Sequence, residues 1–247
     1  MLNEQHRMDV LTNNLANADT NGFKKEGATS QAFDAILAYK IKDSSENTRL
    51  ARRLGVNHPG VKIGEGYTDF SQGPIKSTGN AFDLALTDAG FFAVEFTSKS
   101  GETSVKYTRD GDFTLTEDGR LVTRDGDPVL DENGSYIEVN QLLPVEINSS
   151  GQIIQDGKVV ATIQVTDFED YDYLERYGEN YFQPIEGAQE KEAAAEIRSG
   201  YLETSNISVV TEMVNMITVS RAYESNQKVI TTYDSTLDIA ANQLGRI

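Results

Sequence analysis

The chain has 247 residues, of which 38% are hydrophobic, a formal net charge of −17, and neither Cys nor Trp. This length allows one large domain or two smaller ones, and the lack of Cys excludes disulfides, thiolate metal sites and a cysteine nucleophile. No apolar run approaches the roughly 18 residues that a membrane-spanning helix needs, and the polar N-terminal residues exclude a secretory signal peptide.

The charge is unevenly distributed along the chain. Residues 1–60 carry 8 basic and 7 acidic side chains, residues 61–190 carry 9 and 25, and residues 191–247 carry 5 and 7. Binding of nucleic acid needs clustered Lys and Arg, so the acidic centre argues against a nucleic-acid partner. The pattern predicts a solvated acidic body between two nearly neutral ends.

Residues 1–22 are predicted to form an N-terminal helix. Its apolar side chains recur at the spacings that place them on one helical face. These side chains are Met1, Met8, Leu11 and Leu15. Met1 lies directly on this stripe, so we expect the chain to begin inside a longer helix. The helix should end between Asn17 and Gly22, because Asn competes with helical hydrogen bonding and Gly adopts left-handed backbone.

Residues 23–60 form the predicted connecting segment. Phe23 supplies an apolar anchor just past the end of the first helix. Phe33, Ile36 and Leu37 suggest a short helix, whereas the polar stretch 42–53 indicates an extended connection.

Residues 61–190 are predicted to form a mainly β domain. The stretches 91–96, 106–116, 152–155 and 159–167 are rich in β-branched and aromatic residues and are bounded by Gly, Asp and Asn. Gly-containing turns separate these stretches, as hairpin connections require. The turns span residues 109–112, 117–119, 124–127, 132–134 and 155–157.

Three patterns in the sequence could suggest chemistry. The Arg-Asp-Gly-Asp repeats at 109–112 and 124–127 lack the further oxygen ligands of a calcium loop, so we interpret them as turns. The acidic, Tyr-rich stretch 167–177 could supply a glycosidase carboxylate pair, although adjacent carboxylates are common in so acidic a chain. His6 and His58 lie in contexts that suggest no nucleophile–base pair. No metal site, cofactor site or catalytic site is predicted.

Residues 191–247 are assigned to a C-terminal helix, with the helical pattern extending from Ser205 to Leu244. Without Pro or Gly between Tyr201 and Leu244, a helix of about 40 residues and about 60 Å is expected. Ser220, Gln227 and Asp234 interrupt the apolar seam and would favour one packing register. The simpler alternative is an ordinary two-helix bundle. The predicted seam contains Met213, Met216, Ile217, Tyr223, Ile230, Leu237 and Leu244.

Both ends of the chain resemble a known family. Residues 11–24 (LTNNLANADTNGFK) resemble the signature of bacterial flagellar basal-body rod proteins, with Thr12 where Ser is more usual. At the other end, residues 200–206 (GYLETSN), 212–217 (EMVNMI) and 221–224 (RAYE) are similar to the C-terminal region of the rod and hook family. The central stretches 68–74, 78–85 and 90–92 are similar to the distal rod member, and a proximal rod component is close. Family members carry further residues ahead of the position of Met1.

The resemblance implies an α+β structural subunit. Its long N- and C-terminal helices would pair as a coiled-coil-like inner tube, with the mainly β domain outside. The implied partners are copies of itself, proximal rod and hook-side flagellar proteins, the surrounding basal-body rings and the type III export apparatus, in a basal body outside the cytoplasmic membrane. A different filament-forming or phage-tail-like protein and a secreted carbohydrate-active enzyme are the alternatives. The expected assembly interface consists of Met8, Leu11, Asn13, Asn14, Leu15, Asn17, Gly22, Phe23 and the seven residues of the C-terminal seam.

Overall fold

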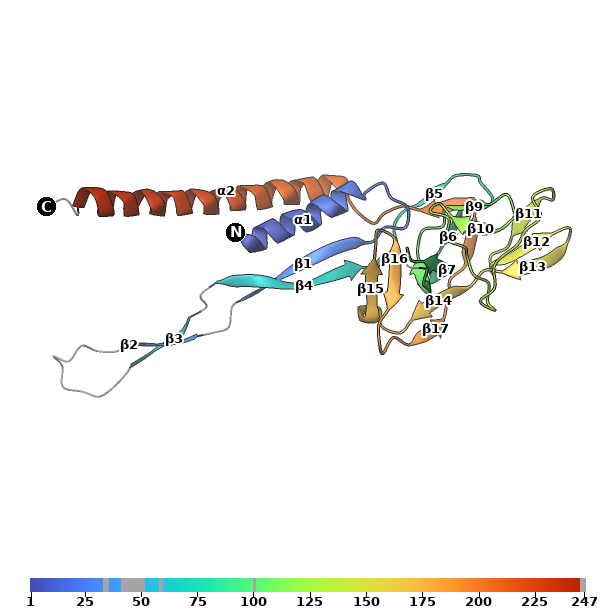
Figure 1. The fold of residues 1–247 in the computed structure, drawn as a ribbon, viewed down its shortest axis with the longest axis horizontal. Helices are drawn as coiled ribbons and strands as arrows, with labels where there is room; N and C mark the ends of the chain where they lie inside the picture. The colour runs from blue at the N-terminus through green and yellow to red at the C-terminus, as the bar shows by residue number, and fades with distance from the viewer. Residues whose placement is uncertain (33–35, 41–51, 58–59, 100, 245–247) are drawn as a thin grey trace. The chain divides into compact units, whose positions relative to one another are not determined.

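The computed structural model describes residues 1–32, 36–40, 52–57, 60–99 and 101–244 (Figure 1). The chain divides into two compact units. We call residues 14–25 and 68–209 the β body, and residues 1–13, 26–67 and 210–247 the helical unit. The fold is α+β with a mainly β centre and a long C-terminal helix, as the sequence predicts.

The β body is built on a six-stranded antiparallel sheet in the order β15-β16-β8-β7-β14-β17. Its longest pairing joins β7 to β8, from Phe92 opposite Thr108 to Thr97 opposite Thr103. The strands of this sheet are β7 (Phe91–Thr97), β8 (Thr103–Thr108), β14 (Val165–Phe168), β15 (Leu174–Tyr177), β16 (Tyr181–Pro184) and β17 (Glu190–Glu192).

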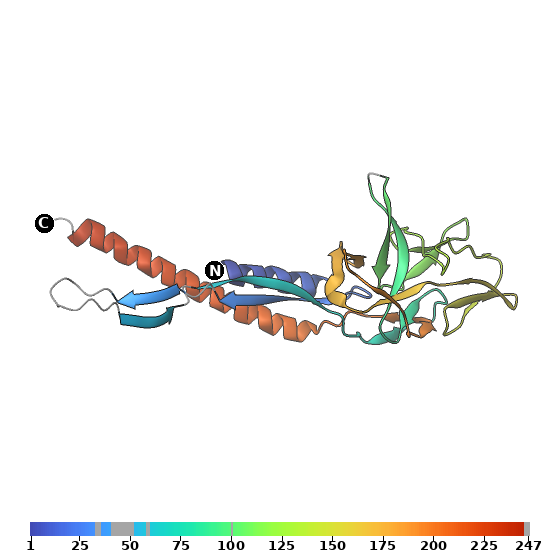
Figure 2. The same ribbon diagram turned by 90° about the horizontal axis from the view of Figure 1, so that it is seen from below.

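Shorter sheets complete the β body. Two-stranded pairs join β19 to β5, β18 to β6 and β10 to β9, and a three-stranded sheet has the order β11-β12-β13 (Figures 1 and 2). A short 3-10 helix, Tyr171–Tyr173, precedes β15. These shorter strands are β5 (Ile75–Ser77), β6 (Leu84–Leu86), β9 (Phe113–Leu115), β10 (Leu121–Thr123), β11 (Val145–Ile147), β12 (Gln152–Gln155), β13 (Lys158–Thr162), β18 (Ile197–Ser199) and β19 (Tyr201–Glu203).

The core of the β body lies on both sides of β7. Successive strand side chains point to opposite faces, so the apolar run at the start of β7 supplies two clusters. Phe92 and Val94 belong to the larger cluster with Leu84, Phe113 and Ile153. On the other face, Phe91 and Ala93 belong to a cluster that is mainly aromatic. Its further buried members are Tyr107, Leu130, Phe168 and Phe182.

The turns of the β body show two uses of glycine. Asp156 and Gly157, with φ of 50° and 73°, form the β12–β13 turn that the sequence predicts. The sequence predicts a positive φ for Gly111 as well, but this residue does not have one. A Cβ there would lie 1.7 Å from the carbonyl oxygen of Leu84, so close backbone approach requires this glycine. The adjoining strands are also shorter than predicted, because breaks separate β8 from β9 and β13 from β14.

Among the residues that the structure describes, the helical unit contains two helices and two β ribbons. The helix α1 (Leu2–Ala16) extends into the first residues of the β body, and α2 (Val209–Ile239) continues into a π-helical turn, Ala240–Leu244. One ribbon pairs β1 (Lys25–Ala32) with β4 (Val61–Asp69). The other ribbon pairs β2 (Ile36–Lys40) with β3 (Arg52–Asn57). Hydrogen bonds link α1 to β1, including one from Asn3 Nδ2 to Ser30 Oγ at 3.0 Å.

Several predicted boundaries are corrected. The C-terminal helix begins at Val209, because residues 190–203 form β17, β18 and β19 of the β body. The N-terminal helix ends at Ala16, one residue earlier than the predicted interval. Residues 36 and 37 lie in a strand and not in a short helix, since they pair with β3. Phe33, His58 and most of the stretch 42–53 lie outside the described residues.

Buried ion-pair cluster and candidate assembly surface

The β body contains a buried cluster of charges centred on Glu203. Lys24 Nζ lies 2.6 Å from Glu203 Oε1, and Arg109 Nη1 lies 3.4 Å from Glu203 Oε2. The backbone N–H of Gly73 also donates to Glu203 Oε1 at 2.8 Å. The side chains of Lys24 and Glu203 are each only 1% exposed. One carboxylate therefore joins three distant segments of the chain inside the β body.

The backbone around this cluster brings the entry and exit of the β body together. The N–H of Gly22 donates to the carbonyl oxygen of Glu203 at 2.8 Å. Gly22 has a φ of 66°, and a Cβ there would lie 2.4 Å from the nitrogen of Asp110. Only glycine satisfies both conditions. The first entry of the chain into the β body and its last exit are thus adjacent, while residues 26–67 belong to the helical unit.

Burial controls the electrostatics of the cluster. Loss of hydration lowers the pKa of Lys24, and the nearby Glu203 carboxylate opposes that shift. Burial likewise lowers the pKa of Arg109, again opposed by Glu203. A buried charge is tolerated only when it is paired and hydrogen-bonded, and Lys24 Nζ also donates to the carbonyl oxygen of Ser71 at 2.9 Å. Each member of the cluster therefore depends on the others.

Further contacts hold the same two segments. The side chain of Asn206 accepts from the N–H of Lys25 at 2.8 Å and donates to the carbonyl oxygen of Asp69 at 2.8 Å. The guanidinium of Arg176 lies 4.1 Å from the ring centre of Phe23. Residues 21–25 and 203–206 are therefore fixed to each other. Sequence reasoning missed this cluster, although Lys24 and Glu203 both lie within the motifs that it singled out.

Asp110 lies beside this junction with a perturbed carboxyl group. Burial, with a smaller contribution from the Asp112 carboxylate, raises the pKa of Asp110 to about 6. Asn180 Nδ2 donates to Asp110 Oδ2 and to the carbonyl oxygen of Asn21, each at 3.3 Å. Protonation of Asp110 is thus linked by contact to the entry segment.

The helix α2 has one shielded face in its first half. Glu212 and Val219 are buried, and Met216 and Tyr223 are half-buried. At roughly 100° per residue these four positions share one face. The opposite face carries four exposed apolar side chains, which are Val210, Met213, Val214 and Ile217.

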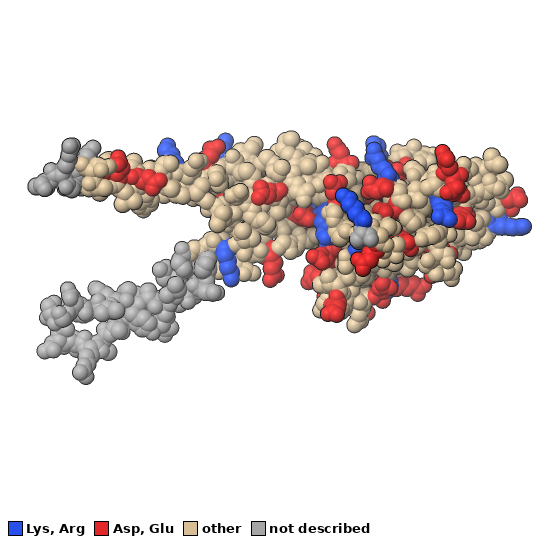
Figure 3. Space-filling view, in the orientation of Figure 1, with Lys and Arg blue, Asp and Glu red and all other residues tan. Residues whose placement is uncertain are grey.

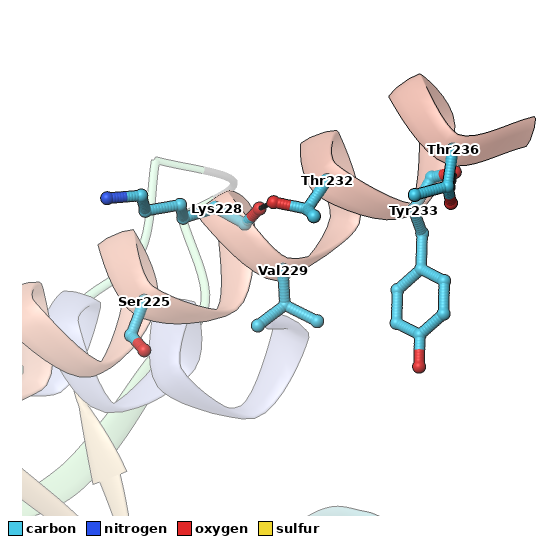
Figure 4. Close-up of a pocket in the computed structure, with 6 residues that line it drawn as sticks. All are labelled: Ser225, Lys228, Val229, Thr232, Tyr233 and Thr236. Atoms are coloured by element: carbon cyan, nitrogen blue, oxygen red, sulfur yellow. Dashed lines mark hydrogen bonds between the residues drawn. The ribbon is translucent and has the colours of Figure 1, made fainter. Parts of the chain in front are cut away.

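The second half of α2 exposes its apolar side chains as well. Figure 4 shows Val229 and Tyr233 projecting from the same side of the helix, one turn apart. Ile230 and Leu237 continue the direction of Met216 and Tyr223, but they are exposed. The visible surface of α2 carries few charges, whereas carboxylates are scattered over the visible surface of the β body (Figure 3). The contrast agrees with the uneven charge of the sequence.

The predicted interface residues fall into three groups. Met8, Leu11, Leu15, Asn17, Met216 and Tyr223 are half-buried, and Asn13, Met213, Ile217, Ile230 and Leu237 are exposed. Asn14, Gly22 and Phe23 are buried in the β body, so the folded chain leaves them no surface for a neighbour. The side chain of Leu244 lies outside the described ones. Along α2, Met213 and Ile217 lie on a different face from Met216 and Tyr223, so a seam that contains all four would be wide.

The acidic, Tyr-rich stretch has structural roles. Tyr171 donates its hydroxyl to Asp167 Oδ1 at 2.7 Å, and Asp170 caps the 3-10 helix by accepting from the N–H of Asp172. Within the described part of the chain, no group of three or more His and acidic residues could hold a metal ion. No helix among these residues is long and apolar enough to cross a membrane.

The fold and its surfaces define a class of protein, a two-part structural subunit with a closed β body and an exposed apolar helix. Three family models match the chain. "Flagella basal body rod protein" matches residues 1–24, "Flagellar hook protein FlgE/F/G D1 domain" matches 85–161, and "Flagellar basal body rod FlgEFG protein C-terminal" matches 198–244.

Curated relatives match over nearly the whole chain. The flagellar basal-body rod protein FlgG of Buchnera aphidicola subsp. Schizaphis graminum is 33% identical, covering 95% of this chain and 92% of the relative. FlgG of Borreliella burgdorferi and the rod protein FlgF of Caulobacter vibrioides are each 34% identical, covering 98% of this chain and 94% of each relative. The chain belongs to the flagellar basal-body rod protein family and is of the FlgG type. It is a structural rod subunit of the basal body in the cell envelope, not an enzyme.

Proposed function

We propose that this rod subunit polymerises through its terminal helices and lies in the distal part of the rod, where it forms part of the drive shaft to the hook. The observation that carries this proposal is the exposed apolar surface of α2. A single folded chain leaves Val210, Met213, Val214 and Ile217 uncovered on one face and Ile230, Tyr233 and Leu237 uncovered further along. Burying such a side chain stabilises a contact by about 1.5–3 kcal/mol, so a series of them favours packing between copies.

The spacing of α2 supports coiled-coil-like packing. Met216, Tyr223, Ile230 and Leu237 recur every seven residues, which is the interval at which side chains keep facing a helical partner. The first two are half-buried in the chain and the last two are exposed. We propose that α1 contributes Met8 and Leu11 to pairing with α2, and that helices of neighbouring copies cover the rest of the seam.

A head-to-tail contact that does not close generates a helical filament, as a shaft requires. The proposed partners are therefore copies of this chain, with proximal rod proteins at one end and hook-side proteins at the other. The acidic β body would face outward, toward the surrounding rings. Export through the flagellar type III apparatus completes the proposal by analogy with the family.

The substitution Ile217→Asp tests this proposal. It places a charge at the centre of the exposed apolar face, so we expect loss of polymers in electron micrographs of the purified protein and of incorporation into isolated basal bodies. The β body should stay folded, with unchanged near-UV circular dichroism. The matched control is Asn215→Asp, which adds the same charge about 200° around the helix and should still assemble. Normal polymers and motility of the Ile217→Asp protein would contradict helix-driven assembly.

A further inference from the structure

The small sheet β11-β12-β13 of the β body has one packed face and two edges. Ile153 belongs to the larger core cluster, and Val145, Ile147 and Ala161 pack against it. The edge strands are β11 and β13, each antiparallel to β12. The two edge strands therefore run parallel to each other (Figure 1). A sheet edge is a ready surface for pairing unless the protein covers it.

Both edges carry exposed apolar side chains. β13 has a bulge between Val159 and Ala161, the residues that pair with Ile154 and Ile153 of β12. Val159 and Val160 at this bulge are 54% and 45% exposed. Beside β11, the preceding turn presents Leu142, which is 91% exposed, and Leu143, which is 40% exposed. A hydrogen bond holds the backbone of Leu142 in this turn, since Asn140 Oδ1 accepts from the N–H of Leu142 at 3.0 Å. Two apolar patches thus lie at opposite edges of one sheet.

The charges at the two edges are complementary. Lys158 begins β13 and is exposed, whereas Glu146 lies at the centre of β11 and is exposed. Basic residues are scarce here, since residues 61–190 contain 9 basic and 25 acidic side chains. The position of Lys158 beside Val159 therefore distinguishes the β13 edge from most of the acidic surface. The β13 edge carries one basic and two apolar side chains, and the β11 edge carries one acidic and two apolar side chains. The two edges are therefore complementary in charge and both offer apolar surface.

We propose that the β13 edge of one copy docks against the β11 edge of a second copy. Because β11 and β13 run parallel, a copy displaced sideways without being turned over presents its β11 to its neighbour's β13. Such a contact is head-to-tail, and each copy can use both edges at once. The inference rests on the proposed assembly and adds to it a contact between β bodies, separate from the contact between helices.

Crosslinking in the polymer tests the contact directly. The chain contains no Cys, so introduced thiols are unambiguous. We would make Glu146→Cys, Val160→Cys and the double variant, and treat polymers and isolated basal bodies with a short bismaleimide. The double variant should give a ladder of covalent multimers, a mixture of the two single variants should give dimers, and each single variant alone should stay monomeric.

The alternative outcomes separate the two proposals. Dimers from Val160→Cys alone would show a two-fold β13–β13 contact and overturn the head-to-tail arrangement. Polymers without any crosslink between positions 146 and 160 would show that another partner covers these edges, and would overturn this inference while leaving helix-driven assembly intact. Failure of the unmodified protein to polymerise or to enter basal bodies would overturn the proposed function, and the contact with it.

A charge reversal provides an independent readout in a second double-cysteine background, Leu142→Cys with Val160→Cys, which keeps the Glu146 carboxylate. There, Lys158→Glu should lower the ladder yield several-fold, because it sets its carboxylate against that of Glu146 across the contact. Lys99→Glu changes the net charge equally on an exposed residue elsewhere in the β body and should leave the yield unchanged. Equal losses from Lys158→Glu and Lys99→Glu would show a general charge effect and contradict the complementary edges.

Discussion

The β body buries a core of large apolar side chains, whereas the helix α2 leaves many of its apolar side chains exposed. In the β body, Phe91 and Phe92 are fully buried on opposite faces of β7, and its central ion-pair cluster is closed within the same chain. In α2, Ile217 is 53% exposed and Leu237 is 65% exposed. The core side chains of the β body find their packing partners within the same chain, whereas the exposed apolar side chains of α2 are not covered by a single chain.

Stability and assembly are therefore encoded in different parts of the chain. Substitutions in the β body should lower the free energy of unfolding of a single chain, because they remove contacts that the chain makes with itself. Substitutions on the exposed faces of α2 should leave that free energy nearly unchanged and should act on polymer formation. Substitutions in the two units and a change of pH would test this separation.

Glu203→Gln should destabilise the β body most. It removes the carboxylate that compensates the buried charges of Lys24 and Arg109, and breaking a buried pair costs about 3–5 kcal/mol. Urea unfolding followed by near-UV circular dichroism would measure the loss. The matched control is Glu138→Gln, whose ion pair with Arg120 is exposed and should change the free energy of unfolding by less than about 1 kcal/mol. Equal effects of the two substitutions would contradict the central role of the buried cluster.

A pair of core and helix truncations should show opposite readouts. Phe92→Ala leaves a cavity in the larger core cluster and should cost about 3–5 kcal/mol of unfolding free energy. Leu237→Ala removes an exposed side chain, so it should leave the unfolding of the β body unchanged and weaken polymer formation. Sedimentation of polymers beside chemical denaturation would measure both quantities. A large loss of β-body stability from Leu237→Ala would contradict the separation of stability from assembly.

The smallest effect concerns pH. The pKa of Asp110 is about 6 in the folded chain, above the ordinary value of 3.8, so the folded state binds the proton more tightly than the unfolded state. The contribution of Asp110 to stability is therefore present below its ordinary pKa and is lost as pH rises through about 6. Between pH 7 and pH 5 the unmodified protein should gain about 1 kcal/mol more than Asp110→Asn. Asp118→Asn removes a carboxylate from an exposed turn and is the control; a pH response equal to that of Asp110→Asn would contradict a specific role of Asp110.

Local sequence patterns predicted much of the β body. The strand 152–155 is found with the same bounds, and the run beginning at Phe91 is β7. These elements follow from residue types that are adjacent in the chain. The strands β18 and β19 and most of β17 fall instead in the stretch predicted as the C-terminal helix, because short strands such as Tyr201–Glu203 depend on distant partners like β5.

The ion-pair cluster could not be derived from periodicity. Lys24 and Glu203 are 179 residues apart, and each is an ordinary charged residue in its local context. The motifs at residues 11–24 and 200–206 indicated the family, but neither motif predicted that the two segments contact each other. The seam on α2 stays a prediction, because the helix turns Met216 and Ile217 by about 100° from each other and only a bound partner would show which of them it covers.

The hydrogen bond from Gly22 to Glu203 joins the chain just after α1 to the chain just before α2. Torque carried by either helix would therefore enter the β body at one junction and not through two independent loops. The buried ion pair between Lys24 and Glu203 lies at this same junction, so a turning subunit would transmit load into closely packed charges.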